Sequence, residues 1–561
     1  MVTDAVPERR KHWGWGPESA QLSRAQLEEA APQVRERLGF GGDEIEEPVP
    51  LDALELRPSR VEPPASLAAI CSSDPYERAS HALGKAYRDV VRGFRGEFPN
   101  PPDVVARPAD EADIERVLAW CADDGLAAIP YGGGTSVVGG VEPRVGDSHA
   151  GAVTIDLGAL DRVLEVDEAS RAARIQAGAL GPHLEDQLRP RGLTLRHFPQ
   201  SFEFSTLGGW IATRAGGHFA TLLTHIDDLV ESVRAITPAG EWESRRLPGS
   251  GAGPSPDRML IGSEGILGVI TEAWVRLQAR PEHKLSCGVS FQDFAAAAEA
   301  VRELAQSGLH PSNCRLLDAT EAEVTGAGPP GRALLVLGFE SAHHPVDHLM
   351  DLALDAVRGH GGEIKEPPRA RRGAGDGGRI RASWDQRSPS APSEQSPVDS
   401  WRSAFLAAPY LRDTFVALGV LSDTFETAIT WDRFEDFHSQ VMEAAGRAVA
   451  EVCGVAPGGA GSPRLSCRFT HIYPDGPAPY YTVLAPAKRG GEVEQWDEIK
   501  AAASEAVIDA GGTITHHHAV GRDHRPWYDR QRPDRFADAL RAAKRAVDPA
   551  GVLNPGVLID P

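Results

Sequence analysis

Three consecutive histidines, His516, His517 and His518 in the stretch THHHAVG (515–521), can exchange protons or bind metals near neutral pH. The pattern allows three interpretations: a metal site, a catalytic base with its neighbours, or a charged surface tract. Adjacent residues cannot all face one way on a helix or strand, so a shared tetrahedral metal is geometrically awkward. On an extended segment, His516 and His518 would share a face and His517 would point away.

A glycine-rich stretch, PYGGGTSVVGG (130–140), is the second segment with chemical potential. It lacks the GxxxxGK[ST] pattern of a P-loop, and Val137 occupies the third glycine position of GxGxxG. Consecutive glycines nevertheless let backbone N–H groups converge on an anion, and Thr135 and Ser136 add hydroxyl donors. The stretch therefore predicts either an anion-binding loop or a glycine-rich surface turn.

Two regions with different predicted patterns of strands and helices surround these segments. Residues 1–98 are expected to be mainly helical. Asp110 and Gly125 then bracket an amphipathic helix, LAAIP forms a buried strand that runs into the glycine stretch, and short alternating strands follow. After residue 280, two strand-helix-strand units predict an antiparallel sheet with helices on one face. Residues 368–399 are rich in Arg, Gly, Ser and Pro and predict a flexible insert.

Length and composition limit the classes of protein. A chain of 561 residues predicts roughly two to four packed units. The net charge of −22 argues against a nucleic-acid partner, whose phosphates would be repelled. Six cysteines without a CxxC pair predict reduced, buried thiols. Because the sequence has no signal peptide and no apolar run of about 18 residues, a soluble cytoplasmic protein is expected.

Four segments resemble a known flavoprotein superfamily. PYGGGTS, PQSFEFSTLGG, TRAGG and GSEGILGVITE, in this order, are similar to the FAD-binding half of the vanillyl-alcohol oxidase (PCMH) type. KHWGWG, the YLRD of 410–413, the WD of 431–432 and HHHAVG resemble the alkyldihydroxyacetonephosphate synthase branch, over residues 11 to the end. The resemblance implies an α+β protein: a helical N-terminal region (1–98), a PCMH-type FAD-binding domain of two α+β subdomains (99–279), a ferredoxin-like antiparallel-sheet cap (280–505) and a C-terminal segment (506–561) that returns to the flavin.

FAD is the cofactor that the resemblance implies. Its expected binding residues are Pro130, Tyr131, Gly132, Gly133, Gly134, Thr135 and Ser136, then Pro199, Gln200, Ser201, Phe202, Glu203, Phe204 and Ser205, then Thr213, Arg214, Ala215 and Gly216, and finally Glu264, Gly265, Ile266, Leu267, Gly268, Val269 and Ile270. Many members of the superfamily attach the flavin through a histidine in the first loop. Residues 130–140 contain no histidine, so a non-covalent FAD is expected.

The branch exchanges the acyl chain of acyl-dihydroxyacetonephosphate for a fatty alcohol, without net oxidation. Carried over by motif, Tyr480 is the expected proton shuttle and Arg412 binds the phosphate, with Arg246 as a weaker second candidate. A phenol with a pKa near 10 needs neighbouring cations to act as a base, and the three histidines could supply them. On this interpretation the histidines form a wall of the active site.

Several alternatives stay open at this point. The same scaffold also carries D-2-hydroxy-acid or alcohol dehydrogenases, and a non-catalytic flavin- or lipid-binding protein would share the motifs. Zinc is a minority option for the histidines, because metal-binding histidines occur in the related dehydrogenases. The expected partners are lipid-like substrates. The arginines of the insert are a candidate for peripheral contact with anionic membrane lipids, and a homodimer is compatible with the resemblance.

Overall fold

The computed structural model describes residues 8–370, 397–455 and 461–560. Most of the insert predicted at 368–399, with five of its six arginines, lies outside the described residues. Its described ends are the short strand β15 (Arg369–Ala370) and the start of the long helix α11 (Pro397–Ala417). The prediction of a flexible segment there stays a prediction.

Two sheets form the half of the molecule that carries the glycine stretch. The first has the order β1-β2-β4-β3, with β1 (Cys71–Ser72), β2 (Val104–Ala106), β4 (Ala152–Asp156) and β3 (Ala127–Tyr131). The second has the order β5-β6-β10-β8-β9, with β5 (Val163–Asp167), β6 (Ala172–Gln176), β10 (Val269–Arg276), β8 (Val230–Thr237) and β9 (Gly240–Glu243). Together with their helices they confirm the expected pair of α+β subdomains, while β1 shows that the N-terminal region also contributes a strand.

Helices and small elements of this half complete the subdomains. They are α2 (Pro75–Ser80), α3 (Tyr87–Phe94), α4 (Glu111–Asp124), α5 (Gly181–Leu188), α6 (Leu207–Thr213), α7 (Asp257–Leu260), and the paired strands β7 (Leu193–Thr194) and β11 (Gln278–Ala279). The Asp110 side chain accepts a hydrogen bond from the Asp113 N–H, and Gly125 ends α4 in the left-handed conformation, as the sequence predicts.

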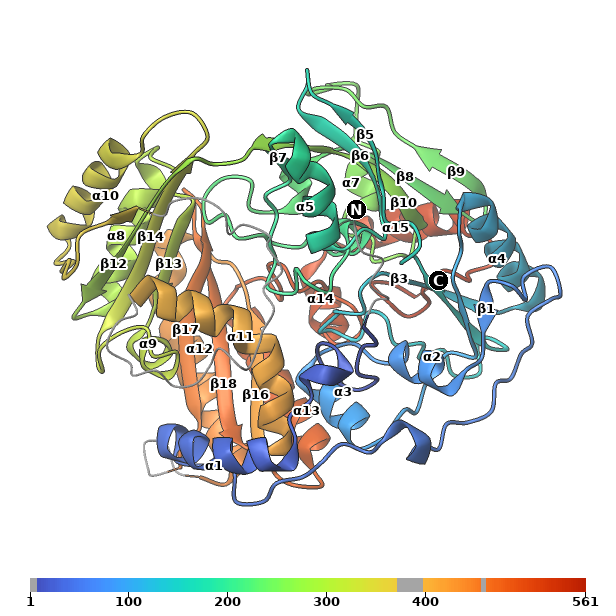
Figure 1. Ribbon diagram of the computed structural model, residues 1–561, viewed down its shortest axis with the longest axis horizontal. Coiled ribbons are helices and arrows are strands. Elements are labelled where there is room, and N and C mark those ends of the chain that lie inside the picture. Colours follow the sequence, from blue (N-terminus) through green and yellow to red (C-terminus); the bar gives the residue numbers. More distant parts are fainter. Residues whose placement is uncertain (1–7, 371–396, 456–460, 561) are drawn as a thin grey trace.

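The cap is a seven-stranded antiparallel sheet of order β15-β12-β14-β13-β17-β18-β16. The other strands are β12 (His283–Phe291), β14 (Ala333–Ser341), β13 (Asn313–Leu317), β17 (Arg464–Ile472), β18 (Pro477–Pro486) and β16 (Val420–Glu426). Helices α8 (Phe294–Gln306), α10 (Asp347–Gly359), α12 (Trp431–Cys453) and α13 (Glu492–Asp509) share the main cap core, whereas α9 (Ala319–Val324) and α11 pack on the opposite face (Figure 1). The expectation of helices on one face is therefore wrong.

Neighbouring residues of β14 show the physical reason. Leu335 and Leu337 belong to the core beneath α8 and α10, and Leu334 and Val336 pack with Trp401 of α11. Because side chains alternate along a strand, a strand that is apolar at every position is covered on both faces. ALLVLGFE is such a run, and both of its faces are buried.

Both ends of the chain join the two halves. Helix α1 (Arg24–Leu38) packs its last turn against the ends of β16 and β18 (Figure 1). The C-terminal region contains α14 (Arg525–Gln531) and α15 (Asp534–Val547), and the Ala128 N–H of β3 donates to the Val552 carbonyl. Among the described residues, no helix is long and apolar enough to span a bilayer.

Candidate active site

A cavity of about 1180 Å³ lies between the two halves of the molecule. Its walls come from the glycine stretch after β3, from α6, from α11, from strands β16, β17 and β18 of the cap, and from the histidine segment. Pockets for drug-sized ligands measure about 300–1,000 Å³. The cavity therefore has room for a dinucleotide together with a second molecule.

Most of the predicted cofactor residues line this cavity. They are Pro130, Tyr131, Gly132, Gly133, Gly134, Thr135, Ser136, Pro199, Gln200, Ser201, Ser205, Thr213, Ala215, Gly216, Glu264, Gly265, Gly268 and Ile270. The structure adds residues that were not predicted, among them Thr206, Gly208, Gly209 and Asn554. The asparagine of NPGVLI donates hydrogen bonds to the carbonyls of Gly140 and Glu264, so the chain end helps to hold this wall.

Seven predicted cofactor residues do not line the cavity: Phe202, Glu203, Phe204, Arg214, Ile266, Leu267 and Val269. The Glu203 carboxylate accepts a hydrogen bond from the Tyr410 hydroxyl at 2.8 Å, and Arg214 pairs with Asp227. Phe202 and Phe204 pack against other aromatic rings, while Ile266, Leu267 and Val269 lie in the core. A turn or strand presents only some of its residues to one side, so contiguous motifs overstate a binding site.

The glycine stretch packs too closely to carry side chains. A Cβ atom on Gly133 would collide with the Phe204 carbonyl, and one on Gly134, whose φ is +67°, would collide with the Tyr131 hydroxyl. Only bare backbone fits between these walls, and the stretch itself lines the cavity. Backbone amides of consecutive glycines can bind an anion such as a pyrophosphate, so the residues present fit the FAD that the motifs imply.

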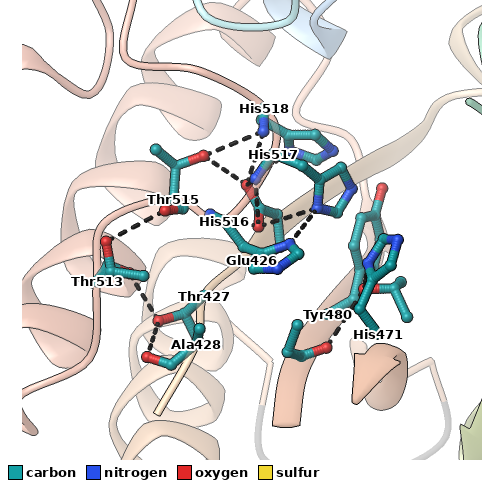
Figure 2. A network of polar contacts seen from close by, with 12 residues as sticks. Glu426, Thr427, Ala428, His471, Tyr480, Thr513, Thr515, His516, His517 and His518 are labelled. Atoms are coloured by element: carbon teal, nitrogen blue, oxygen red, sulfur yellow. Dashed lines mark hydrogen bonds and ion pairs between the residues drawn. The ribbon is translucent and has the colours of Figure 1, made fainter. Parts of the chain in front are cut away.

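The three histidines lie on a turn around one buried carboxylate, Glu426 at the end of β16 (Figure 2). The backbone N–H groups of His516 and His518 donate to this carboxylate at 2.7 and 3.0 Å. The N–H of His517 lies 3.2 Å from both of its oxygens, and the Thr515 hydroxyl donates at 2.5 Å. Burial acts to raise the pKa of Glu426, but its interactions with the histidines, those with His517 first, outweigh it and hold the pKa well below its usual range.

This turn corrects the expected orientation of the histidines. His517 and His518 line the cavity, whereas His516 points away from it towards Tyr473 and His225. The prediction that His517 faces away from the site is wrong, because the segment curves around Glu426 instead of running extended. Alternation of faces holds only for a regular strand.

Tyr480, in β18, lines the cavity beside the two inward histidines. Its ring stacks on His517 with centroids 6.0 Å apart, and its hydroxyl donates a hydrogen bond to Thr424 at 3.0 Å. The guanidinium carbon of Arg468 lies 4.0 Å from its ring centroid. Burial raises the pKa of Tyr480, and Arg468 offsets part of that rise.

The expectation that the histidines lower the pKa of this phenol is therefore wrong. Burial holds the pKa of His516 and of His518 well below the usual value, so these rings are neutral at pH 7. The cations that favour an ionised Tyr480 are Arg468 and Arg412, because arginine stays charged even when it is buried.

Of the two predicted substrate-binding arginines, only one lines the cavity. Arg412 of α11 lines the cavity, and its Nη1 donates to the Lys85 carbonyl at 2.8 Å. Arg246 does not line it: the side chain pairs with Glu231 at 2.7 Å and with Asp167 at 2.9 Å, on the outer sheet of the other half. The prediction of a substrate contact for Arg246 is wrong, because two carboxylates already hold its guanidinium.

A second cluster of histidines adjoins the site. Ring nitrogens of His471, His516 and His517 lie within 4.8 Å of one another. These rings already have partners: His471 Nε2 lies 3.0 Å from the Gly217 carbonyl and His516 Nε2 lies 2.8 Å from the Tyr473 hydroxyl. We assign the cluster to hydrogen bonding, and the absence of a metal stays a prediction.

Comparison with known proteins places the chain in a family. Residues 102–244 match the model of an FAD binding domain, and residues 280–558 match the C-terminal domain of FAD linked oxidases. The chain is 30% identical over 492 residues to the alkyldihydroxyacetonephosphate synthase of Trypanosoma brucei brucei, across 87% of this chain and 78% of that protein. The chain belongs to the alkyldihydroxyacetonephosphate synthase family.

Two further comparisons agree with this assignment. The alkyldihydroxyacetonephosphate synthase of Dictyostelium discoideum is 29% identical over 94% of this chain and 87% of that protein. A solved structure of an alkyldihydroxyacetonephosphate synthase superposes with a TM-score of 0.77, at 24% identity, over 97% of this chain and 98% of that one. The fold of the synthase family is therefore the fold of this chain, and FAD is its cofactor.

Two arginines of the cavity were not predicted from the sequence. Arg315 of β13 and Arg468 of β17 both line it, and Arg468 forms a 2.5 Å ion pair with Glu321. Arg315 sits in a strand that is otherwise largely apolar, in CRLL, whereas the strand of Arg468, RLSCRFTHI, carries other polar residues. A lone charge within a buried strand rarely persists without a partner or a function, and this signal could have found Arg315.

The lining of the cavity includes a set of small and apolar side chains, which we call the apolar arm. Ala404, Ala407 and Ala408 come from α11, and Val34 and Leu38 come from α1, together with Val324, Phe415 and Leu484. Polar residues of the same helices, such as Gln33, Arg37 and Ser400, line the cavity as well. One cavity thus contains several cations and an apolar set of side chains.

Proposed function

We propose that the protein is an FAD-dependent alkyldihydroxyacetonephosphate synthase that exchanges the acyl chain of acyl-dihydroxyacetonephosphate for a long-chain alcohol, a step towards ether lipids. One observation carries the proposal: the glycine loop, Tyr480, the arginines and the apolar arm all open into a single cavity. An amphiphilic substrate with a phosphate at one end and an alkyl chain at the other matches this layout.

The phosphate end of the substrate is assigned to Arg412. A planar guanidinium gives two parallel charge-assisted hydrogen bonds to a phosphate, which a single ammonium cannot reproduce. Its Nη1 is engaged by the Lys85 carbonyl at 2.8 Å, and this contact fixes the side chain on the cavity wall. Arg315 and Arg468 add positive charge to the same cavity.

The chain end is assigned to the apolar arm between α11 and α1. Alanines on α11 leave space that larger residues would fill, and the aliphatic side chains of α1 give the chain an apolar surface. Each buried methylene of an alkyl chain is worth about 0.8 kcal/mol. The arm therefore favours long chains over short ones.

Proton transfer is assigned to Tyr480. FAD supplies an electron-accepting ring beside which the two chains are exchanged. The alcohol must lose its proton as it becomes an ether. Tyr480 lies on the cavity wall beside Thr424, and its phenolate form would take that proton and become the phenol. Arg468 above the ring makes the phenolate less costly.

Three further features remain part of the proposal. FAD is bound without a covalent link, so acid denaturation should leave all of the flavin in the supernatant. The protein works in the cytoplasm and touches membranes peripherally, where its alcohol substrate partitions. A homodimer is the oligomeric state to examine by sedimentation.

The function is tested by product analysis. The purified holoenzyme is incubated with acyl-dihydroxyacetonephosphate and a long-chain alcohol, and the products are identified by mass spectrometry. An ether-linked product that carries the added alcohol supports the proposal. Reduction of a dye by a 2-hydroxy acid, without any ether product, would replace it by a dehydrogenase.

A further inference from the structure

The proposed exchange releases a proton in every turnover, and this inference rests on that function. The alcohol gives up its O–H proton and forms the new ether bond, while the ester oxygen leaves with the acyl chain as a carboxylic acid. A carboxylic acid with a pKa near 4 to 5 is ionised at pH 7. The balance is acyl-dihydroxyacetonephosphate and alcohol on one side, and alkyl-dihydroxyacetonephosphate, carboxylate and H⁺ on the other.

The proton is set free at a wall that is largely closed to solvent. Tyr480 is 5% exposed, and His517 beside it is partly buried. Nδ1 of His517 lies 3.0 Å from Nδ1 of His516 and 3.4 Å from the Glu426 carboxylate, which leaves its Nε2 for a group in the cavity. His517 is therefore the point at which a chain of hydrogen bonds can begin.

The chain continues away from the cavity. Nε2 of His516 lies 2.8 Å from the Tyr473 hydroxyl, and that hydroxyl lies 3.1 Å from the Thr224 hydroxyl. Tyr473 is half-buried and is followed by Pro474 and Asp475, which are exposed. These contacts lead from the cavity wall to the half-buried Tyr473. Thr224 is 3% exposed, so Tyr473 is the end of the chain nearest to solvent.

A second contact of His516 leads to the same side of the molecule. Its Nε2 also lies 3.2 Å from Nε2 of His225, a half-buried residue whose Nδ1 lies 2.9 Å from the Arg214 carbonyl. The other titratable groups that face His516 are His471 and Glu426. Burial lowers the pKa of His471 well below its usual value, so this ring does not compete as a cation.

Each member of the chain can both accept and donate a proton. Burial keeps His516 neutral at pH 7, and a neutral imidazole has one donor and one acceptor nitrogen. Burial also raises the pKa of Tyr473 to about 12, so its hydroxyl stays protonated and can relay a proton. A donor orientation from His517 through His516 and Tyr473 to Thr224 satisfies every contact in turn.

The ring of His516 is not needed to hold the histidine turn. Glu426 already binds the backbone N–H groups of all three histidines, and this does not depend on their side chains. The His516 side chain faces neither the cavity nor the carboxylate beneath the turn. A structural role of its imidazole in the turn is therefore a poor explanation for its contacts.

We propose that His517, His516 and Tyr473 form a proton exit path that carries the proton of the exchange from the active site to the surface. His516 and Tyr473 are positioning and relay residues in this scheme, because they do not touch the substrate. The proton enters at His517, passes through His516, and leaves through the half-buried Tyr473 to water.

The test replaces the relay hydroxyl in the holoenzyme by Tyr473→Phe. We expect kcat for the exchange to fall by about 10²-fold, with an unchanged KM and full flavin content. Imidazole added to the buffer should restore part of kcat in proportion to its concentration, because a small base can carry the proton instead. The solvent deuterium isotope effect on kcat should rise, since proton release becomes rate-limiting.

The matched control is Tyr481→Phe in the adjacent strand β18. Its hydroxyl lies 3.2 Å from Nδ1 of His438 in the cap core, away from the cavity, so kcat should stay near the wild-type value. A wild-type kcat in Tyr473→Phe, or a loss that neither imidazole nor the isotope effect registers, would overturn the path. If the wild type makes no ether product, the proposed function fails first and the path falls with it.

Discussion

The guanidinium carbon of Arg468 lies 4.0 Å from the centroid of the Tyr480 ring, and Tyr480 is the proposed proton acceptor. Glu321 fixes Arg468 from the other side through a 2.5 Å ion pair. A cation over a buried phenol is worth about 2 kcal/mol and favours its ionised form. The arginines, and not the neighbouring histidines, therefore prepare the tyrosine for proton transfer.

Removal of the Tyr480 hydroxyl should abolish most of the activity and leave the fold intact. Tyr480→Phe keeps the ring between Arg468 and His517, so flavin content and melting temperature should change little. The exchange rate should fall by about 10²- to 10⁴-fold, because the proton acceptor is lost. Exchange at the wild-type rate in the steady-state assay would remove Tyr480 from the mechanism.

Replacement of Arg412 by lysine should weaken phosphate binding. Lysine keeps the charge and loses the planar fork, so KM for the phosphorylated substrate should rise about 10- to 100-fold, with full flavin occupancy. Arg246→Lys is the matched control, since Arg246 pairs with Asp167 and Glu231 outside the cavity. Equal KM values for the two variants would place the phosphate elsewhere.

Loss of the Glu426 charge should destabilise the histidine turn. Glu426→Gln leaves some N–H groups of the turn without an acceptor, and the free energy of unfolding should fall by about 2 kcal/mol at pH 7. Because the pKa of Glu426 is lower in the folded protein than in the unfolded chain, its stabilisation is full above the unfolded pKa of about 4.3.

The pH dependence of the free energy of unfolding is the control for the Glu426→Gln prediction. The contribution of Glu426 is lost as the pH falls below about 4.3 towards the depressed folded pKa. Chemical denaturation of both proteins from pH 7 to pH 3 should show the gap between wild type and Glu426→Gln narrowing in acid. A gap that stays constant or widens in acid would mean that the carboxylate is not ionised in the folded state.

A larger side chain in the apolar arm should shorten the preferred alcohol. Ala407 is buried and lines the cavity, so Ala407→Leu places three additional carbons in the channel. At about 0.8 kcal/mol for each displaced methylene, kcat/KM for a 16-carbon alcohol should fall at least about tenfold. An 8-carbon alcohol is the internal control and should be affected less. A uniform loss across the alcohol series would argue against this placement of the chain.

Substitution of Gly209, in α6, tests the proposed FAD-binding wall of the cavity more directly than substitution in the glycine stretch does. A Cβ on Gly133 would collide with the protein itself, so the loss of flavin in Gly133→Val would not prove contact with the pyrophosphate. Gly209 lines the cavity, and a Cβ on it meets only the Thr206 hydroxyl, at 3.3 Å, so a methyl group there fits without a clash against the protein. Gly209→Val should fold with little FAD, and Gly209→Ala should retain more. Wild-type absorbance at 450 nm, roughly the flavin band, in Gly209→Val would exclude this wall.

The sequence predicted which segments form the site better than it predicted where their side chains point. Glycines and turn residues mark where backbone must approach a ligand, and this made the glycine stretch visible. Glu426 is distant from the histidines in sequence and has no motif of its own, so the turn around it could not be foreseen. The predicted orientations of His516 and His517 were reversed because the sequence did not reveal the contact of the turn with Glu426.

The cap shows the same limit at the level of the fold. Alternation of strands and helices was sufficient to predict an antiparallel sheet. The continuous apolar run of β14 already indicated that both faces are covered, yet only the contact of Val336 with Trp401 shows that α11 supplies the second cover. α11 also carries Arg412 and Ala407, so the second layer is the one that builds the substrate site.

The stoichiometry of the products distinguishes acyl-for-alkyl exchange from oxidation. Holoenzyme, acyl-dihydroxyacetonephosphate and a long-chain alcohol are mixed anaerobically without an electron acceptor, and both products are quantified by mass spectrometry. An exchange enzyme should form one ether-linked product for each fatty acid released, over many turnovers and with the flavin oxidised at the end. Fatty acid without ether product, or product formation that stops after one turnover until an acceptor is added, would contradict it.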